Sequence, residues 1–225
     1  MSKRTLMISV LGLMTGVLSH ATPPVWVIDL DDVIEVSSAR YLSDSLEEAS
    51  TSNVPLVVLR IDTPGGWMDS TRDIVKDILA SPVPVAAYVS PEGASATSAG
   101  TYIVYASHVA AMAPATNIGS ATPVRADGEA MEPNLERKVV NDAVAKMRGL
   151  AELRGRNVAW AEKTVREATN LTASEALEQN VIDVMATDIG VLLAKIDGMT
   201  LATKTGSVTL ATKGSEHEVI TSTWF

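Results

Sequence analysis

Apolar residues follow two different periods along the chain, and the changes of period predict strands that alternate with helices. Four short, continuous apolar runs have the length and the β-branched content of buried strands. The stretches between and after them repeat apolar residues every three or four positions, which is typical of helices with one buried face. The predicted strands cover residues 25–30, 54–61, 85–89 and 109–112, and the predicted helices cover residues 37–48, 69–79, 98–106, 135–153, 158–167 and 188–196.

The order of these elements predicts an α/β fold. One more strand is expected over residues 181–185, and strands that alternate with helices form a mostly parallel sheet with helices packed outside it. Residues 115–133 show no period and are predicted to form a loop. We therefore assign residues 22–198 to a single α/β domain.

The pattern changes in the C-terminal tail, residues 199–225. Two copies of Leu-Ala-Thr-Lys, at 201–204 and 210–213, flank a glycine and predict a small two-stranded β-ribbon. The chain ends in Trp224 and Phe225, and aromatic residues of this kind are common at membrane interfaces. Two interpretations stay open: the tail leads to a membrane segment absent from this sequence, or the aromatic pair folds onto the core.

Residues 1–21 have the pattern of a secretory signal peptide. Lys3 and Arg4 precede an apolar run at 6–18, and small residues lead to Ala21, after which cleavage is predicted. The run is shorter than the ~20 residues of a membrane span, although an uncleaved anchor is the alternative. Export to the periplasm or to the extracytoplasmic face of the inner membrane is expected.

The composition excludes several classes of function. Lys and Arg number 18 against 27 Asp and Glu, so the net charge is −9, and a chain without a basic cluster is not expected to bind nucleic acid. The chain has no cysteine, which excludes disulfides, cysteine-ligated zinc and a cysteine nucleophile. With only three histidines, a metal centre is not predicted, and no cofactor is expected.

Two segments of small residues hold the candidate chemistry. Gly65 and Gly66 follow a predicted strand and precede a helix, where outward N–H groups stabilise an oxyanion, although a plain turn explains them too. Ser98 lies among small residues where a helix begins, next to the amide of Ala99. A serine at this position is either a nucleophile or a simple helix N-cap.

A serine nucleophile needs a base, and the histidines are poorly placed for that role. His108 lies ten residues after Ser98, at the far end of a helix roughly 15 Å long, and the others lie in the predicted signal peptide and the tail. A desolvated lysine also accepts a proton. Lys138, in the first turn of the longest helix, is the candidate, and Lys146 is its rival; a solvated lysine is the alternative for both.

Taken in order along residues 24–200, the motifs carry a resemblance. They resemble the NfeD-type membrane-associated serine proteases of the ClpP/crotonase superfamily, and two blocks are also similar to signal peptide peptidase A. The motifs are Asp62-Thr-Pro-Gly-Gly66, Ala96-Thr-Ser-Ala-Gly-Thr-Tyr102, Met112-Ala-Pro114, Ile118-Gly-Ser120, Lys138, Leu171-Thr-Ala-Ser-Glu-Ala176 and Val181-Ile-Asp183.

This resemblance implies a ClpP/crotonase-like fold of repeated ββα units and a serine endopeptidase. By position, Ser98 and Lys138 match the family's Ser-Lys dyad, while Gly65 or Gly66 and Ala99 match its oxyanion-hole amides. The implied substrate is a polypeptide with an apolar segment, such as a stomatin-like membrane protein, and the implied assembly is a homo-oligomer. The ClpP branch uses a histidine about 25 residues after its serine, and this chain has none there.

Some residues depart from the family pattern, and other functions stay open. Thr97 stands where a smaller alanine is usual, and Trp67 follows the glycine pair, so either residue is expected to alter a subsite. One alternative is a non-catalytic partner-binding module of the same fold, in which Ser98 only caps its helix. An acyl-thioester enzyme is less favoured, because Glu92 is the only acidic residue near Ser98.

Overall fold

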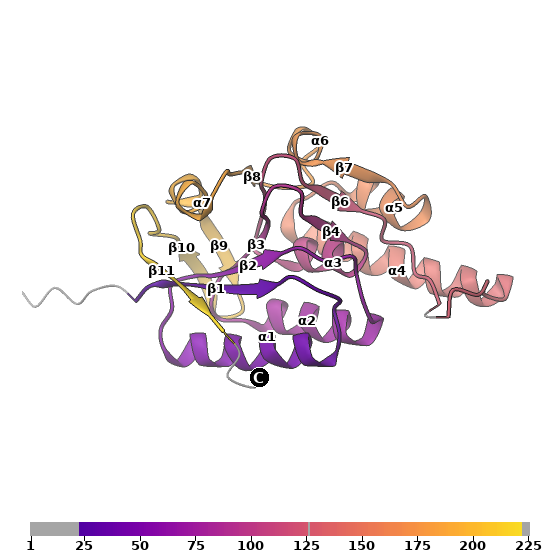
Figure 1. The fold of residues 1–225 in the computed structure, drawn as a ribbon, viewed down its shortest axis with the longest axis horizontal. Helices are drawn as coiled ribbons and strands as arrows, with labels where there is room; N and C mark the ends of the chain where they lie inside the picture. Colours follow the sequence, from indigo (N-terminus) through magenta and orange to yellow (C-terminus); the bar gives the residue numbers. More distant parts are fainter. Residues whose placement is uncertain (1–22, 126, 222–225) are drawn as a thin grey trace, which may run out of the picture.

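A computed structural model of the chain describes residues 23–125 and 127–221, which form an α/β fold around a six-stranded parallel sheet (Figure 1). The strand order is β11-β1-β2-β3-β5-β8. The bounds are β1 Val25–Leu30, β2 Val57–Ile61, β3 Val85–Val89, β5 Val109–Met112, β8 Val184–Met185 and β11 His217–Ile220. All neighbouring pairs run parallel, so the carboxyl ends of the strands share one edge of the sheet.

Both faces of this sheet are buried, because successive side chains of a strand point to opposite sides. Residues such as Leu59 and Ile61 belong to the larger core, to which the first six helices contribute, whereas Val58 and Val27 belong to a smaller core beneath the seventh helix. The helices are α1 Val36–Thr51, α2 Met68–Ala80, α3 Ala99–Ala106, α4 Pro133–Arg154, α5 Val158–Arg166, α6 Ala173–Glu178 and α7 Ile189–Ile196.

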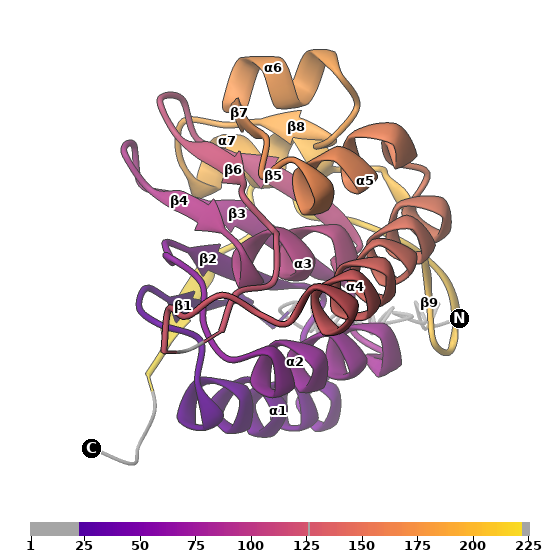
Figure 2. The same ribbon diagram turned by 90° about the vertical axis from the view of Figure 1, so that its right-hand side faces the viewer.

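A second, three-stranded sheet leads directly into Ser98 and lies beside the segment that contains Gly65 and Gly66. It consists of β4 Ser95–Thr97, β6 Asn117–Gly119 and β7 Asn170–Thr172, in the order β4-β6-β7. Figure 2 shows β4 and β6 side by side, with β7 and α6 above them. A bridge between Thr63 and Ala96 joins this sheet to the segment that follows β2.

The predicted α/β class is confirmed, with several corrections at short elements. The strand predicted over 54–61 begins only at Val57, and the one predicted over 181–185 is reduced to Val184–Met185. The predicted loop at 115–133 contains β6, and β4 and β7 were not predicted. Strands of three residues carry too little pattern to be recognised from sequence.

The C-terminal ribbon is confirmed in kind, with a shifted second strand. An antiparallel hairpin pairs β9 Thr200–Thr203 with β10 Gly206–Thr209, so the second Leu-Ala-Thr-Lys copy lies beyond it. The following strand, β11, was not predicted and adds to the edge of the main sheet beside β1. The proposed signal peptide and the pair Trp224 and Phe225 lie outside the described residues. Within those residues, no helix is long and apolar enough to cross a membrane.

Candidate active site

Ser98 occupies a strained backbone position where β4 ends and α3 begins. Its φ of 53° and ψ of −108° lie in a region that residues with a side chain rarely adopt. An N-cap serine has extended backbone angles and accepts a hydrogen bond from the first turn, but the Ser98 side chain makes no such bond. The Ser98 side chain therefore does not cap α3. Ser98 is half-buried, and its hydroxyl is not occupied by a capping bond.

The segment after β2 touches this serine directly. A Cβ placed on Gly65, whose φ is 122°, would lie 2.8 Å from the Ser98 Cβ, so only glycine fits there. A Cβ on Gly100 would lie 2.8 Å from the Thr63 Cγ2, which explains the second small residue after the serine. The small residues noted in the sequence thus allow two chain segments to approach within contact distance.

Of the two adjacent glycines, only Gly66 has an N–H group without an acceptor among the described residues. The Gly65 N–H donates to the Thr63 Oγ1 at 3.1 Å, and Gly65 is buried. Gly66 is exposed and lines the same cavity as Ser98 and Ala99. Ala99 is the first residue of α3, so its N–H lies at the positive end of the helix dipole.

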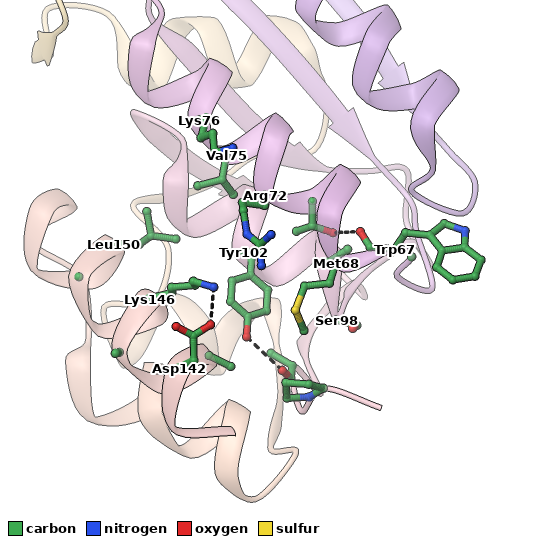
Figure 3. A pocket seen from close by; sticks show the side chains of 18 of the residues that line it. Trp67, Met68, Arg72, Val75, Lys76, Ser98, Tyr102, Asp142, Lys146 and Leu150 are labelled. Carbon is green, nitrogen blue, oxygen red and sulfur yellow. Dashed lines mark hydrogen bonds and ion pairs between the residues drawn. The ribbon is translucent and has the colours of Figure 1, made fainter. Parts of the chain in front are cut away.

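An open cavity of about 810 Å³ extends from Ser98 between α2 and α4, over α3 (Figure 3). We call it the α2–α4 cavity. Its wall is mostly apolar, and several large apolar side chains there are exposed, including Trp67 at 57% and Leu153 at 61%. The main apolar lining residues are Val33, Trp67, Met68, Val75, Leu79, Tyr102, Val124, Leu150 and Leu153.

Charged residues in this cavity are neutralised by neighbours on their own helices. Arg72 pairs with Asp69 at 2.8 Å, and Lys146 forms an ion pair with Asp142. In Figure 3, Arg72 and Lys146 extend toward Tyr102, whose hydroxyl points away from both of them along its hydrogen bond. Burial and the charge of Asp142 raise the pKa of Tyr102, so its neutral hydroxyl donates to the Ala121 carbonyl at 3.3 Å. Because these polar side chains are paired with neighbours, apolar side chains form most of the surface that a ligand would contact in the cavity.

The two candidate lysines differ in position. Lys146 lines the α2–α4 cavity, and its amine is engaged in an ion pair with Asp142 on the same helix. Lys138 lies exposed in the second turn of α4, which begins at Pro133, and it is not among the residues that line the cavity. The structure therefore brings Ser98, Gly66 and Ala99 together and leaves Lys138 outside this group.

His108 lies at the opposite end of α3 from Ser98, as expected. It is buried, and its Nδ1 accepts the Val85 N–H at 3.1 Å. Burial, with Arg154 and Arg156 adding to the effect, lowers the pKa of His108 to about 4. This histidine is a neutral structural residue and is not part of the candidate site.

Thr63 was not predicted as a site residue. It is fully buried beneath the Gly65 turn. The sequence shows Thr63 only as part of the Asp-Thr-Pro-Gly-Gly motif, in which the glycines were the predicted oxyanion donors.

Comparison with known proteins identifies relatives that are membrane-bound proteases. A family model described as the N-terminal domain of NfeD1b matches residues 24–193. The membrane-bound protease PH1510 of Pyrococcus horikoshii is 42% identical over 154 residues, which cover 67% of this chain and 34% of PH1510. The chain therefore spans about a third of the length of this curated relative.

Solved structures of a protease called 1510-N share the fold. This protease is described as membrane-bound and stomatin-specific. A variant with a serine replaced by alanine matches with a TM-score of 0.83 and 35% identity, covering 90% of this chain and 100% of that one. A variant with a lysine replaced by alanine, in complex with a substrate peptide, also has a TM-score of 0.83, with 34% identity and coverage of 91% and 94%.

Proposed function

The chain belongs to the family of NfeD1b N-terminal domains, and on this premise we propose that it is an exported serine endopeptidase that cleaves apolar segments of membrane-associated proteins. One observation carries the proposal. Ser98 is strained, its side chain makes no capping bond, and it lines a large apolar cavity beside two amides that have no acceptor within residues 23–125 and 127–221. A strained residue persists only where the surrounding structure holds it, and such residues cluster at active sites.

The proposed reaction is acyl transfer through Ser98. The Ser98 Oγ attacks the scissile carbonyl while the neutral Lys138 amine accepts its proton, and the amides of Gly66 and Ala99 donate to the resulting oxyanion. Collapse of the tetrahedral intermediate breaks the C–N bond, and the leaving amine takes the proton from Lys138. Water then attacks the ester by the same route and releases the free Ser98 hydroxyl.

Lys138 must approach Ser98 for this reaction. A lysine that works as a base near neutral pH needs its pKa lowered by roughly three units from about 10.4, and burial is the usual cause. Lys138 is exposed in the unbound chain. We therefore expect the first two turns of α4, which include Lys138, to move toward the serine when a substrate occupies the cavity and excludes water.

The dimensions of the α2–α4 cavity support an apolar peptide substrate. Its lining on α2 runs from Met68 to Leu79, which corresponds to ~16 Å of helix. An extended peptide rises ~3.3 Å per residue, so this length accommodates about five residues on one side of the scissile bond. The relative 1510-N is described as specific for a stomatin homologue, and we propose a stomatin-like membrane protein as the substrate here.

The remaining parts of the proposal follow from the family resemblance. We propose a homo-oligomer located at the extracytoplasmic face of the inner membrane. The reaction needs neither metal nor cofactor, since the base, the nucleophile and the oxyanion donors are all groups of this chain.

The proposal is tested by incubating residues 22–225 with a library of apolar peptides, beside Ser98→Ala, Lys138→Ala and Lys146→Ala. We expect Ser98→Ala and Lys138→Ala each to lower kcat/KM by a factor of ~10³ or more, because each removes a reacting group. Lys146→Ala is the comparison on the same helix: because Lys146 lines the cavity, its loss is expected to change KM for the peptide but to leave kcat unreduced. Cleavage that is undiminished in Lys138→Ala would refute the dyad.

A serine-directed acylating probe separates the enzyme from the alternative, a partner-binding module of the same fold. The probe is expected to label the native chain and not Ser98→Ala. If the folded native chain takes up no label and cleaves no peptide, yet binds apolar peptides, the binding module is the correct function.

A further inference from the structure

We propose that Thr63 is a positioning residue that makes the Gly66 amide, and not that of Gly65, the second donor of the oxyanion hole. The inference deepens the proposed function and rests on it. The sequence left the two glycines as equal candidates. The hydrogen bonds around Thr63 distinguish them.

The backbone of Thr63 ties the glycine turn to the strand that carries the serine. Its N–H donates to the Ser95 carbonyl at 2.8 Å, and its carbonyl accepts the Thr97 N–H at 3.1 Å. Thr97 immediately precedes Ser98, so the turn and the nucleophile belong to one hydrogen-bonded unit. A shift of Thr63 is therefore transmitted to both.

The side chain of Thr63 forms a hydrogen bond with the N–H group of Gly65. The hydroxyl donates its single proton to the Asp32 carbonyl at 2.6 Å and accepts the Gly65 N–H at 3.1 Å. Thr63 is fully buried, so water does not compete for these bonds. The Gly65 N–H is consequently not available to a substrate.

Ile34 fixes the orientation of the next amide. Its N–H donates to the Gly65 carbonyl and its carbonyl accepts the Trp67 N–H, both at 2.8 Å. In a parallel bridge of this register, the N–H and C=O of the intervening residue point to the opposite edge. Gly66 therefore turns its N–H away from Ile34, and its backbone lines the cavity that also contains Ser98.

The methyl group of Thr63 has a separate role. A Cβ on Gly100 would approach the Thr63 Cγ2 to 2.8 Å, so this methyl already packs against the first turn of α3. That contact sets the spacing between the Gly66 turn and the Ala99 amide. The Thr63 hydroxyl determines which glycine amide is free to donate, and the Thr63 methyl sets the distance between the Gly66 and Ala99 amides.

The test compares Thr63→Val, which keeps the shape and loses the acceptor, with Thr63→Ser, which keeps the hydroxyl. For an apolar peptide substrate, we expect Thr63→Val to lower kcat by roughly 10- to 100-fold with KM changed by less than about threefold, because an oxyanion donor acts in the transition state. Thr63→Ser should retain kcat within about fivefold. A peptide aldehyde, which forms a tetrahedral adduct with the serine, should bind Thr63→Val more weakly in proportion to the loss of kcat.

Thr212→Val is the matched control for the loss of a buried hydroxyl. Thr212 is fully buried, its Oγ1 donates to the Leu193 carbonyl at 2.7 Å, and it packs on the other face of the sheet. It should lower the unfolding midpoint without changing kcat. If Thr63→Val does not fold, Thr63→Cys replaces it, since a thiol is a weak acceptor of similar size.

Two results overturn the inference while the proposed function stands. One is a native chain that cleaves the peptide and a Thr63→Val variant with the same kcat. The other is a Thr63→Val variant that loses kcat but binds the peptide aldehyde as tightly as the native chain, which would assign the loss to a step other than stabilisation of the oxyanion. A native chain with neither turnover nor aldehyde binding refutes the proposed function, and with it this inference.

Discussion

The two ends of α3 differ in how their backbone groups are satisfied. At the C-terminal end, the Arg156 guanidinium donates to the carbonyls of Val104, Tyr105 and Ser107 at 2.9 to 3.1 Å, and the Arg154 Nε donates to the Ala106 carbonyl at 2.9 Å. At the N-terminal end, Ser98 is strained and the first amide has no internal acceptor among the described residues.

The contrast shows how an eight-residue helix supports an unfavourable conformation at one end. Arg156 also pairs with Asp183 at 2.7 Å, and its side chain is 1% exposed. Cations at a helix C-terminus complement the dipole, and a buried, hydrogen-bonded arginine anchors the last turn. The anchored end holds α3 in place, so the strained end keeps its amides open for a ligand. The candidate site lies where backbone amides are free, and the anchor lies where two arginines donate to the last carbonyls of the helix, with only the Arg156 Nε left without a partner among the described residues.

Breaking the anchored end is expected to have the largest effect on stability. Arg156→Leu removes the cation that pairs with Asp183 and the donor to several buried carbonyls, so we expect the free energy of unfolding to fall by ~3–5 kcal/mol. Urea denaturation followed by circular dichroism measures this change. Arg154→Leu is the control, because Arg154 is only partly buried, and its loss should be smaller. Equal effects of the two variants would contradict the special role of Arg156.

The same end predicts a dependence of stability on pH. The folded pKa of His108 is lowered to about 4 from an unfolded value of 6.5, so the unfolded chain binds this proton more readily. The contribution is complete above about pH 6.5 and is lost as the pH falls toward 4, with a maximum of ~3 kcal/mol. Urea denaturation at pH 7, 6 and 5 measures the slope.

The control for this pH dependence is His108→Asn. An asparagine Oδ1 can accept the Val85 N–H without titrating, so the variant should show a flatter decline between pH 6.5 and 5. An unchanged slope in that interval would assign the acid sensitivity to other groups.

Relieving strain at the open end is expected to have the smallest effect, with the opposite sign. Ser98→Gly removes the side chain that makes a φ of 53° unfavourable, and we expect stability to rise by ~1 kcal/mol, partly offset by the flexibility of glycine in the unfolded chain. Ser98→Ala keeps a Cβ and should show no such gain. Thermal unfolding of both variants measures the difference, and a gain in Ser98→Ala equal to that in Ser98→Gly would refute the strain.

The main strands and helices were predictable because each carries a period of its own. The apolar run of β3 was predicted over its observed range, and α4 was predicted to within two residues at its N-terminus and one at its C-terminus. The strand predicted over 181–185 was too long, because Asp183 turns out of the strand to pair with Arg156 and to accept the Ala110 N–H. That interaction involves residues far apart in the sequence and leaves no local signal.

The candidate site was predictable only in part, for the same physical reason. Ser98 and the glycine pair stand out in sequence, because close approach of two segments excludes larger side chains. The difference between Gly65 and Gly66 depends on Thr63 and Ile34, which the sequence gives no reason to connect. The placement of Lys146 in the cavity and of Lys138 outside it depends on how α4 packs against α3 and α5.

Periodicity, charge and small residues along the chain thus determined the fold class, the order of elements and the identity of the nucleophile candidate, because each is a local property. The tertiary structure alone decided which amide stays free, which end of α3 is anchored and which lysine faces the cavity. These depend on contacts between residues such as Thr63 and Ser95, or Arg156 and Asp183, which come together only when the chain folds.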